Sequence, residues 1–309
     1  LALGLILLTL GLLAHPVRFG GLRLLIGLGL ALIVFSGKAG ALAAVVIFSG
    51  ACAATGLGGI RLFARDSSGE DAFGLPRVLT GFFIGLGLNG YLVWVAMHYP
   101  INTPAAYWLL LCGEGLLFRK TLQAWFADWM KKLKSMELTP GQKIILITGL
   151  FYLPYALVPF YSWDDLGVHL YIPKYVSLFG SFHFSSDYFF ALDHAIIPRS
   201  AYTVLFLTGG EFAIRLFNTS LFPVSFLFLE RAIRARWGLR IATLTTIFAV
   251  TTPFIIWSLA VVFIDSFALF AGVWLLAFMI DFISGPAAGK TVRFFAFGAL
   301  AYLCKQTLI

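Results

Sequence analysis

A polar segment, residues 161–199, carries the residue types best suited to chemistry. It reads YSWDDLGVHLYIPKYVSLFGSFHFSSDYFFALDHAIIPR and holds four of the 14 acidic residues and three of the five histidines. Asp164 and Asp165 can supply a general base or ligands for a divalent cation, and His169 follows Asp165 at i+4 spacing. Carboxylates at a helix start also cap free N–H groups, so both roles stay open. We predict a helix that begins at this pair and is bent or ended by Pro173.

Four ionisable residues outside this pair are further candidates. Lys174 and Arg199 add positive charge to the same segment, where they either neutralise an anion or are ordinary loop polarity. Asp265 lies within VVFIDSFALF, where apolar surroundings make an ionisable group expensive and therefore functional by default. Lys305 either contacts an anion or snorkels to the lipid headgroups. His169 stays open between substrate contact, metal ligand and packed side chain, since no spacing here is diagnostic of a metal.

The composition requires a membrane to position these residues. Hydrophobic residues make up 60% of the chain and charged residues only 12%, whereas soluble domains carry roughly 25% charged residues. Several apolar runs approach or exceed the roughly 17 residues that cross a bilayer core. Cys52, Cys112 and Cys304 all lie in such runs without C-x-x-C spacing, so we interpret them as small hydrophobes. We therefore expect an all-α fold, a polytopic transmembrane helical bundle.

Apolar runs and their polar breaks predict about ten spans. These are residues 1–14, 20–36, 39–56, 77–98, 103–118, 143–160, 210–229, 241–260, 266–282 and 294–309. Residues 200–208 are too short to span and are expected to dip into the outer interface. The chain begins at Leu1 and ends at Ile309 within an apolar run, so we expect both ends to be cut.

The basic residues give these spans a direction. When sides are assigned alternately, one face receives all 22 basic residues except Lys38, Lys174, Arg199, Arg215 and Lys305, and the positive-inside rule makes that face cytoplasmic. The formal charge of +8 is thereby explained by contact with membrane lipids, and nucleic acid is not expected as a partner. Residues 119–142 combine apolar and basic residues at helical spacing and are predicted to lie on the cytoplasmic surface.

This topology brings the candidate residues to one membrane face. Asp164 and Asp165 fall in the outer loop, and Asp265 falls at the outer end of its span. Lys305 lies about 18 Å from the cytoplasmic start of its span at 1.5 Å per residue, and therefore in the outer half. The topology uses basic residues alone, so the convergence of the three acids is independent of how their roles are assigned.

The ordered residues of this region resemble the GT-C fold membrane glycosyltransferases that use polyprenyl-phosphate sugars, which include protein O-mannosyltransferases and the lipid A aminoarabinose transferase. The resemblance covers residues 160–309. It is carried by Trp163-Asp164-Asp165-Leu166, His169-Leu170 and Lys174, then by Ala213, Arg215, Leu216 and Asn218, and finally by Pro253, Asp265 and Lys305. It divides the chain into a transmembrane extension over 1–142 and a catalytic region over 143–309. In the best-known members the acidic loop follows the first span, whereas here about six spans precede it.

The resemblance implies an enzyme of the bacterial inner membrane with its active site on the non-cytoplasmic face. Asp164 would be the general base toward an acceptor hydroxyl, while Asp165 and Asp265 would bind a divalent metal cation or orient the substrate. His169, Lys174, Arg199 and Lys305 would bind the substrate, and the cationic groups among them would neutralise the donor phosphate. The acceptor would be a lipid, a protein or a glycan.

Two other classes of protein compete with this interpretation. A transporter or flippase would line a path at mid-depth between two repeated halves with ionisable groups. The acids here cluster on one face, and no clear internal repeat is present. A structural scaffold would have no need to place Asp265 in apolar surroundings.

Overall fold

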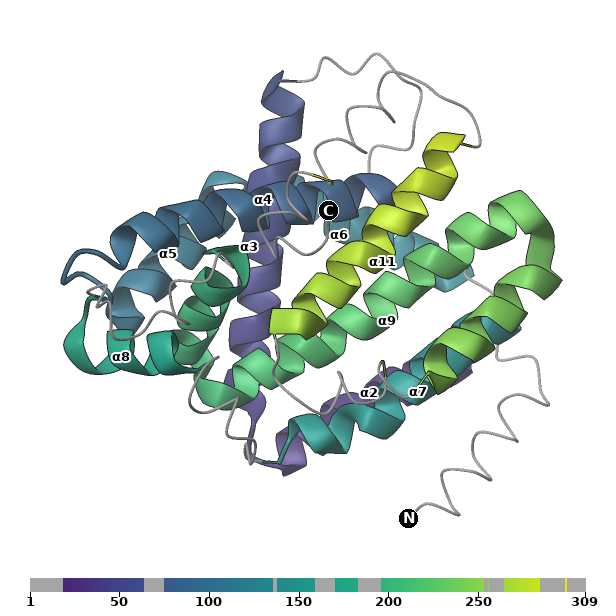
Figure 1. Ribbon diagram of the computed structural model, residues 1–309, viewed down its shortest axis with the longest axis horizontal. Coiled ribbons are helices and arrows are strands. Elements are labelled where there is room, and N and C mark those ends of the chain that lie inside the picture. The colour runs from purple at the N-terminus through teal and green to yellow at the C-terminus, as the bar shows by residue number, and fades with distance from the viewer. Residues whose placement is uncertain are drawn as a thin grey trace.

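The computed structural model describes residues 19–63, 75–135, 138–158, 170–182, 196–252, 255, 264–283 and 298, with the backbone alone at several helix ends. Every element in these ranges is a helix, as predicted (Figure 1). The helices are α2 (Phe19–Phe35), α3 (Ala39–Phe63), α4 (Leu75–Ala96), α5 (Pro104–Leu117), α6 (Arg119–Ser135), α7 (Pro140–Ala156), α8 (Tyr171–Phe179), α9 (Ile196–Thr251) and α11 (Ile264–Ile283).

Four of these helices are long and apolar enough to cross a membrane. The qualifying ranges are Ala39–Ile60, Pro76–Ala96, Ile196–Thr251 and Ser266–Ile283. Ile26–Phe35 and Pro104–Leu117 are shorter apolar helices. The expected span 1–14 lies outside the described residues, and so does the expected span 294–309 except for residue 298. Residues from both predicted regions, 1–142 and 143–309, share one hydrophobic core.

Helix α9 is the central element and has three straight pieces. Its helical geometry is interrupted at Gly210 (φ 72°) and Gly238 (φ 83°), and positive φ at both positions explains why glycine is found there. The chain turns back at Gly238, so that the last two pieces lie side by side (Figure 1). Helices α3, α4, α7, α8 and α11 all pack against α9.

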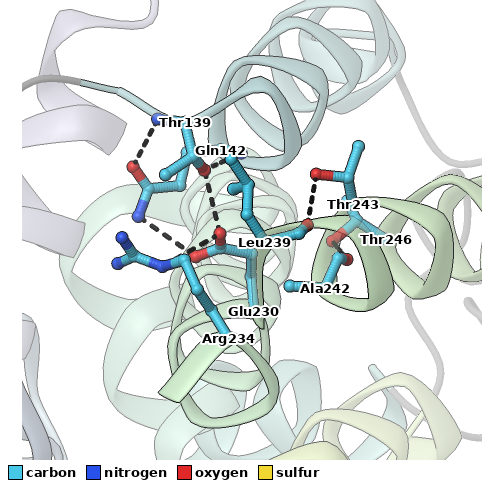
Figure 2. A network of polar contacts seen from close by, with 8 residues as sticks. All are labelled: Thr139, Gln142, Glu230, Arg234, Leu239, Ala242, Thr243 and Thr246. Atoms are coloured by element: carbon cyan, nitrogen blue, oxygen red, sulfur yellow. Dashed lines mark hydrogen bonds and ion pairs between the residues drawn. The ribbon is translucent and has the colours of Figure 1, made fainter. Parts of the chain in front are cut away.

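The N-terminus of α7 is fixed to α9 by a buried carboxylate (Figure 2). Thr139 and Gln142 form a capping box at this helix start. Glu230 of α9 is 0% exposed and accepts hydrogen bonds from Thr139 Oγ1 at 2.9 Å and Gln142 Nε2 at 3.1 Å. Arg234 Nε lies 3.4 Å from Glu230 Oε1. The negative charge of Glu230 is thus placed at the positive end of the α7 dipole.

Helices α3 and α4 cross at close range because both carry small residues at the contact. A Cβ atom built on Gly85 would lie 1.8 Å from the carbonyl oxygen of Cys52, and one built on Gly56 would lie 1.7 Å from that of Gly81. Gly81 and Gly85 form a G-x-x-x-G spacing, which lets helix backbones approach in membranes.

The predicted helix within 119–142 is confirmed as α6, Arg119–Ser135. Phe126, Trp129 and Met130 on this helix are exposed although they are large and apolar. Its position on the cytoplasmic surface of a membrane stays a prediction.

Pro173 was expected to bend or end a helix that begins at Asp164 and Asp165, and the prediction that the helix ends there is wrong. Helix α8 begins at Tyr171, so Pro173 lies in its first turn and not at its end. A first turn tolerates proline because the N–H groups there have no partner within the helix. Helix α8 ends at Gly180, which has the left-handed conformation of a helix C-cap.

Candidate functional site

The structure describes only part of the predicted site. Asp164, Asp165, His169 and Lys305 lie outside the described residues. Asp265 is the second residue of α11, and the structure describes its backbone alone. Among the predicted site residues, only Lys174 and Arg199 have described side chains. Lys174 is half-buried on α8, and Arg199 is buried on the first piece of α9.

Arg215, at the start of the middle piece of α9, holds the other end of α7. Its buried guanidinium donates from Nη1 to the carbonyl oxygen of Tyr155 at 2.8 Å and to that of Val158. These carbonyls end α7, where the helix dipole is negative, so a cation there is favourable. Sequence analysis placed Arg215 among the residues of the resemblance without assigning it this contact.

Arg215 and Glu230 therefore hold α7 at its two ends. They are 15 residues apart, or about 22 Å along a helix, and the 17 residues of α7 span about 25 Å. The match in length allows the middle piece of α9 to pair a cation with the C-terminus of α7 and an anion with its N-terminus. The residue before the undescribed stretch 159–169, Val158, is fixed as a consequence.

The first and second pieces of α9 are joined by a buried polar pair. Tyr202 and Asn218 exchange hydrogen bonds at 3.1 and 2.8 Å. Thr203 Oγ1 donates to the carbonyl oxygen of Arg199 at 2.9 Å and contacts Met97 Sδ at 3.5 Å. The pair joins the two pieces of α9 that carry Arg199 and Arg215, and the threonine contacts the residue that follows α4.

Asn102 ties the α4–α5 connection to the end of α8. Its amide nitrogen donates to the carbonyl oxygens of Ala96, Tyr99 and Gly180 at 2.9, 2.7 and 2.7 Å, and its oxygen accepts from Tyr107 Oη at 2.6 Å. Because α8 also packs against α9, Lys174 is carried by an element that is fixed to α9.

Helices α8 and α9 border the undescribed stretches 159–169 and 183–195. They carry three cations, Lys174 on α8 and Arg199 and Arg215 on α9. Buried guanidinium groups require compensating negative charge or acceptors, and Arg215 finds them in α7. Such a set of cations suits an anionic substrate. In the described part of the chain no three His, Cys, Asp or Glu side chains come together, and the metal role of Asp165 and Asp265 stays a prediction.

A second polar group, on helices α3, α4 and α5, was not predicted from the sequence. Glu114 lies in α5 within the apolar run WLLLCGEGLLF, and an acid in such a run was a usable signal. Asn89 Nδ2 of α4 donates to Glu114 Oε2 at 3.0 Å and lies 3.6 Å from Cys52 Sγ of α3. The expectation that the acids cluster on one membrane face did not consider Glu114.

Comparisons of the chain with protein-family models, with curated proteins and with solved structures find no match. The assignment of a function consequently rests on the residues themselves and on the placement of the three cations.

Proposed function

We propose that the chain is the membrane part of a glycosyltransferase that moves a sugar from a polyprenyl-phosphate donor to an acceptor hydroxyl at the non-cytoplasmic face. Asp164 takes the proton of the acceptor hydroxyl, and the acceptor oxygen attacks the anomeric carbon opposite the phosphate. The phosphate leaves with the bonding electron pair, and Lys174, Arg199 and Lys305 stabilise its charge. The donor's lipid tail enters from the bilayer, which explains why such an enzyme is embedded in a membrane.

The observation that carries the proposal is the capping of α7 by Arg215. This contact fixes Val158, which precedes Asp164 by six residues. Leu170, at the start of α8, follows Asp164 by six residues. The described chain therefore holds both ends of the short segment that carries the proposed base.

The chemical argument favours an anionic donor. Lys174 and Arg199 lie on α8 and on the first piece of α9, the elements that border the undescribed stretches, and we assign them to the donor phosphate. Asp165 and Asp265 would hold a divalent cation if the enzyme uses one, and that cation would add charge stabilisation at the phosphate. His169 would contact the substrate. The acceptor would be a lipid, a protein or a glycan.

The test is consumption of a labelled polyprenyl-phosphate sugar, including release to water, by membranes that carry the full-length protein. We expect Asp164→Asn to lose nearly all donor consumption while the protein amount and its unfolding temperature stay unchanged. Asp187→Asn, in the same polar segment but without an assigned role, is the matched control and should retain activity. Retained activity in the Asp164 variant would remove it from the role of base.

A proton-coupled transporter or flippase is the second candidate, and Glu114 is the observation that favours it. A carboxyl inside apolar helices is typical of proton and ion pathways. If the wild type consumes no donor across several sugars, this second function becomes the better proposal.

A further inference from the structure

The pair formed by Glu114 and Asn89 lies among apolar helix surfaces. Asn89 is 2% exposed, more than one turn from either end of α4, and Glu114 is half-buried about 15 Å from the start of α5. Leu117, which neighbours Glu114 on the helix surface at i+3, is 76% exposed, so the side of α5 next to Glu114 faces lipid if the helix is embedded. A carboxylate here has apolar side chains next to it on its own helix.

No described cation compensates a negative charge on Glu114. Its interactions in the described part of the chain are with Asn89 and with neighbouring groups of α3, and none is an ion pair. An ionised carboxyl without a partner is costly in apolar surroundings, and such groups bind a proton instead.

The amide oxygen of Asn89 is suited to accept a hydrogen bond from a protonated Glu114. A carboxylic acid and a primary amide are complementary, because the amide N–H donates to one carboxyl oxygen while the carboxyl O–H donates to the amide oxygen. The first of these bonds is present at 3.0 Å. The acceptor for the second, Asn89 Oδ1, is buried and has no hydrogen-bond partner among the described residues. An ionised Glu114 has no proton to donate to that oxygen.

We propose that Glu114 is a proton-binding carboxyl inside the membrane, which is neutral through a bound, exchangeable proton and is positioned by Asn89 at the lipid-facing edge of α5. The site is distinct from the proposed glycosyltransferase residues and does not depend on that activity.

The described groups that face Glu114 from the neighbouring helices include no second carboxyl, so we assign the titration to Glu114. Helix α3 presents Cys52, which is 0% exposed, and the hydroxyl of Thr55, while α4 presents Asn89. Helix α6 begins with Arg119 and Lys120, neither of which pairs with Glu114. Helix α9 packs against α5, but none of its charged residues has a contact with Glu114 in the described part of the chain.

The test is labelling of the full-length protein in membranes by a lipid-soluble carbodiimide. The protonated carboxyl adds across one C=N bond of the reagent. Its oxygen binds the central carbon, its proton moves to nitrogen, and the resulting O-acylisourea rearranges to a stable N-acylurea. The reaction needs no other reactant. The labelled residue is identified by mass spectrometry of wild-type peptides, so the result does not depend on the folding of a variant.

We expect wild-type Glu114 to be labelled, and total labelling to fall at least tenfold in Glu114→Gln. Asp128→Asn, on α6, the helix expected on the membrane surface, should label like the wild type. Because only the protonated form reacts, the rate should fall about tenfold per pH unit above its midpoint. Infrared difference spectra of wild type and Glu114→Gln should contain the carbonyl band of a protonated carboxyl.

Absence of both label and band would show that Glu114 is ionised and would overturn the proposal. Protection from labelling by Na⁺ at constant pH and ionic strength would identify a metal-cation site in place of a proton site. A carbonyl band without labelling would overturn the placement of the carboxyl at the lipid-facing edge.

Discussion

Replacing Gly85 by alanine tests the close crossing of α3 and α4. The added Cβ would lie 1.8 Å from the carbonyl oxygen of Cys52, whereas ordinary van der Waals contact begins at 3.4 Å. The obstructing atom belongs to a helix backbone and cannot rotate away. The two helices must therefore separate locally by about 1.6 Å, or one of them must bend.

The expected cost follows from the packing that this separation removes. A radial gap of about 0.5–1 Å already forfeits a quarter to a half of a dispersion contact. Overpacking of a tight contact typically costs about 1–3 kcal/mol, and an overlap with backbone places Gly85→Ala at the upper end of that range. Asn89 is one turn farther along α4, so the same displacement also strains its hydrogen bond to Glu114.

The matched control is Gly50→Ala on α3. A Cβ built on Gly50 meets nothing within 4 Å, so this variant should gain about 0.5–1 kcal/mol from the helix preference of alanine. Unfolding of both variants in detergent micelles, followed by tryptophan fluorescence, gives the free energy of unfolding. Equal changes in the two variants, or a stabilised Gly85→Ala, would refute the close crossing.

Three further predictions test the contacts that hold the two ends of α7. Arg215→Met should lower the free energy of unfolding by about 1–3 kcal/mol, because two carbonyls of α7 lose their donor, and it should reduce donor consumption more than Asp187→Asn does. An unchanged unfolding profile would contradict that contact. Glu230→Gln should lower the free energy of unfolding by a similar amount. Arg234→Ala should lower the free energy of unfolding by less than about 1 kcal/mol, since the Arg234 side chain is 40% exposed. A larger loss of stability in Arg234→Ala than in Glu230→Gln would be inconsistent with the contacts in Figure 2.

The chain's class and most of its helices could be predicted because hydropathy and helix periodicity are local properties. The run that became α4 was expected at 77–98 and is found at Leu75–Ala96, and the amphipathic pattern after Phe118 became α6. The start of α8 was misjudged, since a proline fits the first turn of a helix as well as its end. Local sequence alone does not distinguish these two positions.

The tertiary structure decided which polar groups meet. Arg215 and Tyr155 are 60 positions apart, and Glu230 and Thr139 are 91 apart, so no spacing rule relates them. The partner of Glu114 could not be predicted either, because Asn89 belongs to another helix. The close approach of α3 to α4 depends on glycines, and their role is visible only once the two backbones are in contact. Hydropathy determined that this chain forms apolar helices, since each residue contributes to it independently. Packing decided where their few charges lie, since a buried charge is stable only beside a group that folding brings to it.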